Sequence, residues 1–389
     1  MTSPRILCLY GTAGAGHRRA AEAVTEALRA AGATAVTLDV MTYAHRAFRA
    51  VYVGGGLRLI TRWPRLYGLA YRATDYHAVD RLVRGARARA QQLSAPHLLR
   101  AVQAFDPQVV IGTHFLAAEL CAAWRVTRRL AAPLITVITD FEPHRLWQHA
   151  GTDAYCAPTP QAADRLVRDG VEPPRVTVTG IPIAAAFAAK IDREAARRRL
   201  KLAADRPVLL IMGGGLGVGG IDRVARSLLN QPAPAQVVFI TGVNRSLRRS
   251  LRALNPDWIV RGFVDNMPEW LAAADVAISK AGGLAASELL AAGVPTIVPR
   301  VLTGHETRNA QYFASTGAAR LADDADKALT LARDLLENEA ARDEMRLAAR
   351  RAARPQAADD VARLALRLAS ARLDFRRNDY VAHPTVSAG

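Results

Sequence analysis

The residues with the clearest potential for chemistry lie between Ser279 and Asn309. An apolar run that ends at Ser279 is followed by Lys280-Ala281-Gly282-Gly283 and then by a helical pattern that carries Glu288. A diglycine at a strand-to-helix junction lets backbone N–H groups approach a ligand closely, and a helix N-terminus attracts an anion. Glu288 offers two carboxylate oxygens to hydroxyl groups. A diphosphate that carries sugars suits this combination, although two glycines alone are equally consistent with an ordinary packed turn.

A second glycine-rich segment, Gly213–Gly220, has six glycines in eight positions and follows the apolar run Pro207–Met212. Each glycine raises the entropic cost of folding, so a flexible turn explains this segment less well than a loop whose amides meet a ligand. Each such donor can lower the barrier for a leaving anion by about 3 kcal/mol. A third loop, Gly11–His17, places a histidine after three glycines. The candidate donors of the second segment are Gly213, Gly214, Gly215 and Gly217.

Alternating elements must position these loops. Apolar strand patterns separated by helical patterns predict parallel sheets that are covered on both faces. The pattern restarts after Ile183, which predicts an α/β chain with two Rossmann-like domains facing a central cleft. We expect an N-terminal domain at 1–188, a C-terminal domain at 189–355, and a helix within 356–389 that packs back on the first domain before a loose tail. The expected strands are 5–10, 35–39, 108–112, 134–139, 176–179, 207–212, 236–241, 258–261 and 274–279, with helices at 20–31 and 193–200 among those between them.

Positive charge is concentrated in one part of the chain. The 389 residues carry a net charge of +17 with 48 Arg and 4 Lys, a bias that alone identifies no partner. Between Arg46 and Arg100, however, 11 arginines outnumber two aspartates, and aromatic residues lie among them. This mixture suits a surface that binds anionic lipid; a solvated face over core aromatics is the alternative. No nucleic-acid recognition motif accompanies the arginines. The candidate membrane contacts are Trp63, Arg65, Tyr67, Tyr71 and Arg72.

Other features bear on the cellular context. No apolar run approaches the roughly 18–20 residues of a membrane-spanning helix, and no secretory segment is evident. The three cysteines, Cys8, Cys121 and Cys156, lack the spacing of metal ligands. The sequence therefore predicts a globular cytoplasmic protein with reduced core cysteines, and it indicates no metal and no cofactor.

Several short motifs resemble, in their order, those of a known glycosyltransferase family. They are similar to motifs of bacterial processive diacylglycerol glucosyltransferases and plant monogalactosyldiacylglycerol synthases, which share the two-domain GT-B fold with MurG. A single glycine motif is weak support, whereas ordered motifs between residues 6 and 320 are strong support. Ala281 replaces a proline, and His305 a glutamine, that family members commonly carry. The motifs are Gly14-Ala15-Gly16-His17, Thr139-Asp140-Phe141 with His144, Gly262-Phe263-Val264, Lys280-Ala281-Gly282-Gly283 with Glu288, and Gly304-His305-Glu306 with Asn309.

The resemblance implies an inverting transfer of a hexose from a UDP-sugar to a hydroxyl group, without a metal. Such a reaction needs a base near the acceptor hydroxyl. His17 is the candidate because an imidazole titrates near physiological pH; binding the acceptor or shaping the loop is the alternative. Asp140 would orient the acceptor or the base, or cap a helix. Glu288 would hold the ribose. The other donor-side residues implied are Phe263, Val264, Met267, Lys280, Gly282, Gly283, His305, Glu306 and Asn309, and the acceptor-side residues are Gly14, Gly16 and His144.

Together, the resemblance and the basic stretch favour one function. It is a peripheral enzyme on the inner face of the cell membrane that glycosylates a diacylglycerol-like lipid. A UDP-sugar 2-epimerase, or a MurG-like transferase acting on a polyprenyl-linked or soluble acceptor, is the alternative. A non-catalytic module that binds nucleotide sugar or lipid is less favoured, since His17, Glu288 and the glycine loops are all present.

Overall fold

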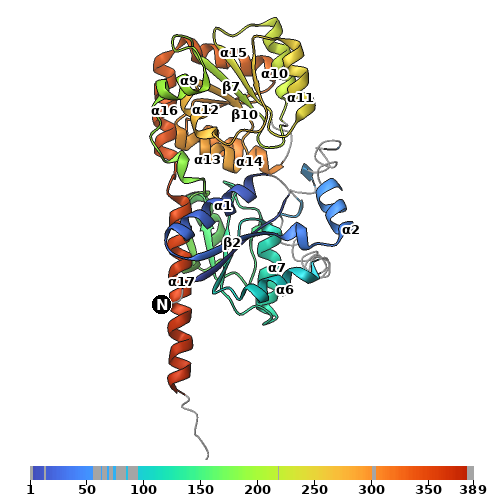
Figure 1. Cartoon of the computed structure of the whole chain (residues 1–389), viewed down its shortest axis with the longest axis vertical. Helices are drawn as coiled ribbons and strands as arrows, with labels where there is room; N and C mark the ends of the chain where they lie inside the picture. The colour runs from blue at the N-terminus through green and yellow to red at the C-terminus, as the bar shows by residue number, and fades with distance from the viewer. Residues whose placement is uncertain are drawn as a thin grey trace, which may run out of the picture.

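Two parallel six-stranded sheets organise the chain into two lobes (Figure 1). The computed structural model describes residues 3–12, 15–55, 63, 68–69, 73–75, 85, 95–217, 219–299 and 304–382. The strand order is β2-β1-β3-β4-β5-β6 in the first sheet and β12-β11-β10-β7-β8-β9 in the second, and neighbouring strands pair in parallel. The fold is therefore α/β with two Rossmann-like halves, as the alternating pattern predicts.

The N-terminal lobe holds the first sheet. Strands β3, β4 and β5 are buried along their whole length, as expected where helices cover both faces of a parallel sheet. The strands are β1 (Arg5–Tyr10), β2 (Thr34–Asp39), β3 (Val109–Gly112), β4 (Leu134–Val137), β5 (Ala154–Ala157) and β6 (Val176–Val178). The principal helices are α1 (Ala15–Ala30), α2 (Arg46–Arg49), α6 (Pro96–Phe105), α7 (Phe115–Val126) and α8 (Pro160–Arg168), and a short 3-10 turn, η3, spans Arg145–Trp147.

The C-terminal lobe repeats the plan. Its strands are β7 (Val208–Met212), β8 (Gln236–Ile240), β9 (Ile259–Arg261), β10 (Val276–Ser279), β11 (Thr296–Pro299) and β12 (Ala319–Ala322). Its helices are α9 (Arg193–Leu200), α10 (Ile221–Asn230), α11 (Arg245–Leu254), α12 (Met267–Ala273), α13 (Gly283–Ala292), α14 (Gly304–Ser315), α15 (Ala325–Glu337) and α16 (Glu339–Ala352). A last helix, α17 (Ala357–Ala382), leaves this lobe and packs against α1 of the first lobe (Figure 1).

The structure differs from the sequence-based expectations in a few elements. Helix α1 begins at Ala15 and not at residue 20, so His17 lies in its first turn and not in the preceding loop. Strands β5 and β12 were not expected, because β5 is short and rich in alanine and β12 is a four-residue edge strand whose two middle residues are exposed. The C-terminal helix extends to Ala382, into the range where a loose tail was expected. Residues 383–389 lie outside the described part.

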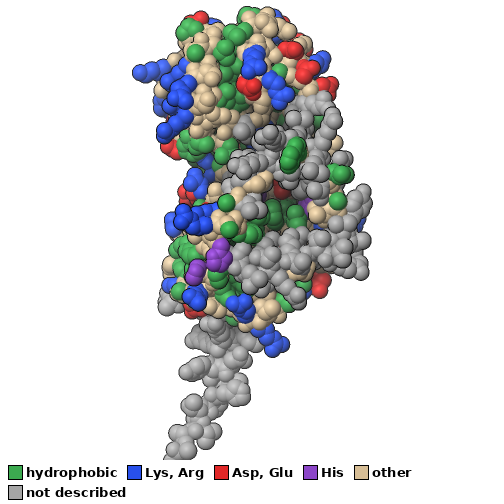
Figure 2. All heavy atoms as spheres, turned by 90° about the vertical axis from the view of Figure 1, so that its right-hand side faces the viewer, with side chains coloured by type: hydrophobic (Ala, Val, Ile, Leu, Met, Phe, Trp, Pro, Cys, Tyr) green, Lys and Arg blue, Asp and Glu red, His purple; other side chains and the backbone are tan. Residues whose placement is uncertain are grey.

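The surface carries basic side chains on both lobes. Figure 2 shows Lys and Arg side chains on the described parts of the upper and the lower lobe. Within the described residues, we find no helix with both the length and the apolar composition needed to cross a membrane. Cys8, Cys121 and Cys156 are buried and unbonded to one another.

Candidate active site

The predicted glycine loops lie at the switch points of both sheets. In the first sheet β1 and β3 are neighbours, and the strands that follow them in sequence, β2 and β4, lie on opposite sides of this pair. In the second sheet β7 and β10 are neighbours, and β8 and β11 lie on opposite sides in the same way. Ligands of open α/β sheets bind outside the carboxyl ends of the strands at such points. His17 follows β1, the Gly213 loop follows β7 and the Gly282-Gly283 turn follows β10. The topology therefore brings the main sequence-predicted segments to the two ligand-binding edges.

His17 is held by hydrogen bonds that define its tautomer. Its Nδ1 lies 2.9 Å from the carbonyl oxygen of Thr113 and 2.9 Å from Oγ1 of Thr139. Because a carbonyl oxygen only accepts, Nδ1 of the neutral ring carries the proton and Nε2 carries the lone pair. Thr113 Oγ1 donates in turn to the His17 carbonyl oxygen at 2.9 Å. The imidazole is thus fixed in the tautomer that allows Nε2 to act as a base.

Aromatic side chains surround the His17 ring. The ring of His114 lies edge-on with its centroid 4.5 Å away, and the indole of Trp147 lies 6.3 Å away. His114 is fully buried, and its Nδ1 accepts the Leu116 N–H, so it caps α7. Burial, and next the nearby His17, lower the pKa of His114 well below its ordinary value. His114 is therefore a neutral structural neighbour of the candidate base.

The two lobes meet at the glycines of the loops. A Cβ on Gly283 would lie 2.1 Å from the carbonyl oxygen of Thr139, and one on Gly215 would lie 2.6 Å from Cβ of Ala15. Distances this short leave room for no side chain, so the close approach of the lobes requires glycine at both positions. Thr139 touches both the His17 ring and the backbone at Gly283. The candidate base and the candidate phosphate-binding turn therefore share one site.

Lys280 brings a positive charge to the second glycine loop. Its side chain packs along that loop, with Cε 3.1 Å from the Cβ position of Gly214 and Cβ 3.4 Å from that of Gly219. Its Nζ donates to Oε1 of Glu306 at 2.6 Å. The loop turns back on itself, since the Gly217 N–H donates to the Gly214 carbonyl oxygen at 3.0 Å. A cation, backbone amides and the N-termini of α10 and α13 thus converge where a diphosphate would carry its charge.

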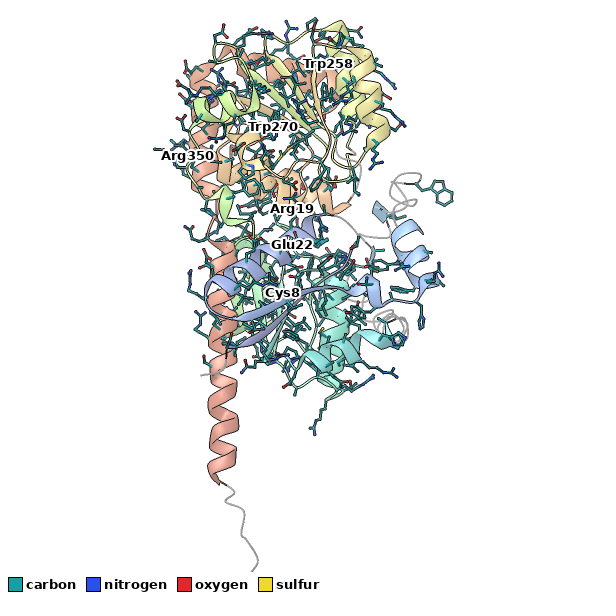
Figure 3. All side chains as sticks on the ribbon, viewed as in Figure 1. Cys8, Arg19, Glu22, Trp258, Trp270 and Arg350 are labelled. Carbon is teal, nitrogen blue, oxygen red and sulfur yellow. The ribbon has the colours of Figure 1, made fainter. Side chains whose placement is uncertain are left out.

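Glu288 and Phe263 lie beside an arginine of the other lobe. Glu288 is buried in α13; burial raises its pKa to about 7, and the charge of Arg19 partly opposes that shift. The Arg19 guanidinium lies 5.3 Å from the centre of the Phe263 ring, a cation–π distance. Arg19 projects from α1 between the lobes (Figure 3). The side chain of Phe263 is 42% exposed, whereas Met267 is buried and Val264 packs partly buried against the core.

Asp140, His144 and Asn309 have partners that the sequence did not indicate. Asn309 bonds to Asp140 across the lobes, and Trp147 Nε1 donates to the second oxygen of Asp140 at 3.3 Å. His144 is buried, its Nδ1 accepts the Leu146 N–H to cap η3, and its Nε2 lies 3.7 Å from Asp75. These contacts make His144 part of a structural network. Direct contact of His144 with an acceptor remains a prediction.

Several predicted site residues lie outside the described part of the chain. Gly16 is described and packs against Leu284 of the other lobe, with its Cβ position 3.5 Å from Leu284 Cβ. Trp63 is described and is 60% exposed. The predicted residues that lie outside the described part are Gly14, Arg65, Tyr67, Tyr71, Arg72 and the side chain of His305.

Sequence reasoning missed the groups that support the predicted side chains. Thr113 and Thr139 fix the His17 ring, Arg19 approaches Glu288, and Arg308 bonds to Asp75. Thr139 lies within one of the predicted motifs, but its residue type alone indicates no role. The others carry no local signal, because their partners come from distant parts of the chain.

Solved structures share this fold. MurG of Acinetobacter baumannii superposes with a TM-score of 0.61 at 18% identity, covering 94% of this chain and 100% of that one. A protein from Listeria monocytogenes, described as a putative UDP-N-acetylglucosamine 2-epimerase, gives a TM-score of 0.59 at 16% identity, covering 92% and 95%. The architecture is that of the GT-B glycosyltransferases.

Sequence comparison identifies the family. The profile described as monogalactosyldiacylglycerol (MGDG) synthase matches residues 17–183, and that of the glycosyltransferase family 28 C-terminal domain matches residues 208–364. A probable monogalactosyldiacylglycerol synthase 2 of Oryza sativa subsp. japonica is 30% identical over 335 residues, which are 80% of this chain and 69% of that protein. The chain belongs to the family of the monogalactosyldiacylglycerol synthases and processive diacylglycerol glucosyltransferases.

Bacterial relatives carry the second family name. A processive diacylglycerol beta-glucosyltransferase of Bacillus cereus strain AH187 is 29% identical over 367 residues, which are 92% of each chain. One from Staphylococcus epidermidis strain RP62A is 35% identical over 211 residues. That match spans about half of each protein, 53% of this chain and 54% of the staphylococcal enzyme.

Proposed function

We propose that this chain is an inverting glycosyltransferase that moves a hexose from a UDP-sugar to the hydroxyl group of a diacylglycerol-like lipid at a membrane surface. The observation that carries the proposal is the placement of His17. Its Nδ1 proton is fixed by Thr113, and its ring shares Thr139 with the Gly283 turn of the donor lobe.

The proposed step needs one base and one stabilised leaving group. The acceptor oxygen bonds to C1 of the hexose while the bond from C1 to the phosphate oxygen breaks. The electron pair of that bond leaves with UDP, and the hydroxyl proton moves to Nε2 of His17. Because the acceptor attacks opposite the departing UDP, an α-linked donor gives a β-glycoside.

The departing UDP gains charge that this chain can stabilise without a metal ion. Lys280 lies against the glycine loop. Helices α10 and α13 follow the N-cap residues Gly220 and Gly282, with their N-termini toward the same edge of the sheet. Preorganised amides and a cation at that position act on charge that develops in the transition state. Activity unchanged by EDTA is expected, whereas a loss that Mg²⁺ restores would contradict this part of the proposal.

The membrane part of the proposal rests on the basic, aromatic stretch. Trp63 and Leu69 within it are 60% and 61% exposed, so large apolar side chains face the surrounding medium there. We propose peripheral binding to anionic lipid on the inner face of the cell membrane. Sedimentation with vesicles of phosphatidylglycerol and phosphatidylcholine tests this, with pure phosphatidylcholine vesicles as the control. Equal binding to both vesicles would contradict it.

The reaction is tested with purified protein and a panel of UDP-hexoses. Each donor is incubated with and without dioleoylglycerol in mixed micelles; UDP release is followed, and products are read by mass spectrometry and by the anomeric coupling in NMR. We expect UDP release only with lipid, and a β-linked glycolipid. Conversion of the UDP-sugar without lipid would identify an epimerase instead, and binding without turnover on any acceptor would identify a non-catalytic module.

A further inference from the structure

Helix α14 joins the donor lobe to the candidate acceptor lobe. Its first turn carries Glu306, which bonds to Lys280 of its own lobe. Within the next two turns, Arg308, Asn309 and Tyr312 all contact the N-terminal lobe. In Figure 1, α14 lies at the lower edge of the upper lobe, next to the junction. One helix therefore links the predicted sugar-binding loop with the segment that contains Asp140.

Asn309 makes two complementary hydrogen bonds across the junction. Its side chain is fully buried; Oδ1 accepts the Phe141 N–H at 2.8 Å, and Nδ2 donates to Oδ1 of Asp140 at 3.1 Å. A backbone N–H only donates and a carboxylate only accepts, so the orientation of the amide is determined. The second oxygen of Asp140 accepts from Trp147, whose indole lies 6.3 Å from the His17 ring. A series of contacts therefore connects α14 to the aromatic side chains that surround the His17 ring.

Two further contacts of α14 support the same junction. The rings of Tyr312 and Phe141 stack with centroids 4.3 Å apart. Arg308 bonds to Asp75 at 2.9 Å and lies 3.6 Å from Glu142. Burial opposes ionisation of Asp75, but the electrostatic effect of the nearby His144 and the hydrogen bond from Arg165 outweigh it and lower the Asp75 pKa to about 2. Asp75 is thus a stable anion at neutral pH.

We propose that Asn309 is a positioning residue that clasps the two lobes together through Asp140 and Phe141, and that this clasp, and not a contact with the donor sugar, is its role. The inference rests on the proposed function in placing His17 and Asp140 at the acceptor. The structural argument for the clasp is independent of that function. When the lobes separate, the side-chain amide of Asn309 and the Phe141 N–H lose their buried hydrogen-bond partners. The approach of the two lobes is therefore coupled to the position of Asp140 and of Trp147, which bonds to it.

The test exchanges the hydrogen-bond donor and acceptor between positions 309 and 140. Asn309→Asp sets one carboxylate against another and keeps only the bond to Phe141. Asp140→Asn sets an amide donor against either Asn309 or Trp147. In the double variant, the amide introduced at position 140 can donate to the carboxylate introduced at position 309 and accept from Trp147. That carboxylate still accepts from Phe141, so all three bonds are restored and only the one between positions 140 and 309 has reversed direction. Gln311→Glu on the exposed side of α14, and Asp164→Asn on the surface of α8, are matched controls.

Closure is measured directly by a spin-label distance between the lobes, with UDP bound and no lipid present. Labels are placed at Val126→Cys and Leu254→Cys, at side chains that are 63% and 42% exposed. The native Cys8, Cys121 and Cys156 do not compete, because burial raises the pKa of each thiol to about 12. Thermal melting of each variant checks that it is folded, and Asn309→Ala serves as a milder variant if Asn309→Asp fails to fold.

We expect a longer and broader distance in both single variants and the wild-type distance in the double variant and the controls. In transfer assays, Asn309→Asp should lower kcat by about 10- to 100-fold, since a buried polar contact is left unmade, with the Kd for UDP-sugar unchanged. A wild-type distance in Asn309→Asp, or a double variant as open as the single ones, would overturn the clasp. Weaker UDP-sugar binding at an unchanged distance would assign Asn309 to the sugar. Failure of lipid glycosylation alone would affect the proposed function and leave the distance result intact.

Discussion

In the N-terminal half of the site, the proposed chemistry rests on one side chain, which a backbone carbonyl oxygen and a hydroxyl group hold in place. His17 owes its tautomer to the carbonyl oxygen of Thr113, and Thr139 Oγ1 is a second contact of the same ring nitrogen. In the C-terminal half, it rests largely on backbone, at the Gly213 loop and the Gly282-Gly283 turn, with Lys280 as the added charge. The difference follows from the two tasks. Proton transfer needs one group of suitable pKa, whereas a diphosphate needs many fixed donors.

The two halves should therefore respond differently to substitution. A side-chain change in the first half should act on turnover, and a backbone change in the second should act on the fit between the lobes. A buried carboxylate in the second half should make the free energy of unfolding depend on pH. The following variants test these differences, from the largest expected effect to the smallest.

Removing the candidate base should have the largest effect. His17→Ala should lower kcat by about 10²- to 10⁴-fold, the usual contribution of a general base, and leave the Kd for UDP unchanged. Stopped-time assays of lipid glycosylation and calorimetric titration with UDP measure the two quantities. His97→Ala, an exposed histidine on α6, is the control. Unchanged kcat in His17→Ala would remove His17 from the mechanism.

Adjacent glycines of the donor turn should differ sharply. Gly283→Ala places a Cβ 2.1 Å from the Thr139 carbonyl oxygen, whereas the nearest atom to a Cβ on Gly282 is Lys280 Nζ at 3.9 Å. Displacing the lobes by about 1 Å should lower kcat/KM about 100-fold in Gly283→Ala, and Gly282→Ala should change it little. Equal losses in both variants would mean that the closeness of the lobes at Thr139 does not matter.

The buried carboxylate should give a pH signature in stability. The pKa of Glu288 is about 7 in the folded chain against an ordinary 4.5, so the folded state binds the extra proton between these values. The free energy of unfolding should therefore fall by about 2–3 kcal/mol as pH rises from 4.5 through 7. Glu288→Gln should remove that component, and Glu344→Gln, exposed on α16, should not. Denaturant unfolding at pH 5, 6, 7 and 8 measures the slopes; identical slopes in all three proteins would argue against the buried charge.

Removing one hydrogen bond to the candidate base should have the smallest effect on kcat. Thr139→Val removes one hydrogen-bond partner of His17 Nδ1, and the Thr113 carbonyl oxygen remains. One neutral hydrogen bond contributes about 1 kcal/mol, so kcat should fall about 5-fold. Thr330→Val, exposed on α15, is the same change without a site partner. A loss as large as that of His17→Ala would give Thr139 itself a role in the reaction.

Local sequence was sufficient for much of the fold and for the glycine loops of the C-terminal lobe. Apolar runs and glycines mark β1, β7 and β10 and the loops that follow them, because these signals depend on near neighbours in the chain. The boundaries were less well predicted where a tertiary contact extends an element. Helix α1 begins five residues before the expected start, where Ala15 meets Gly215 of the other lobe.

By itself, the sequence determined the alternation of strands and helices, the glycine loops, and the presence of His17 and Glu288, since each depends on residue type and short spacing. Only the tertiary structure decided which groups act on which. His17 meets Thr139 across 122 positions of the chain, and Asn309 meets Asp140 across 169. Hydrogen bonds between such distant residues depend on how the two sheets and α14 pack, and no local pattern encodes that packing.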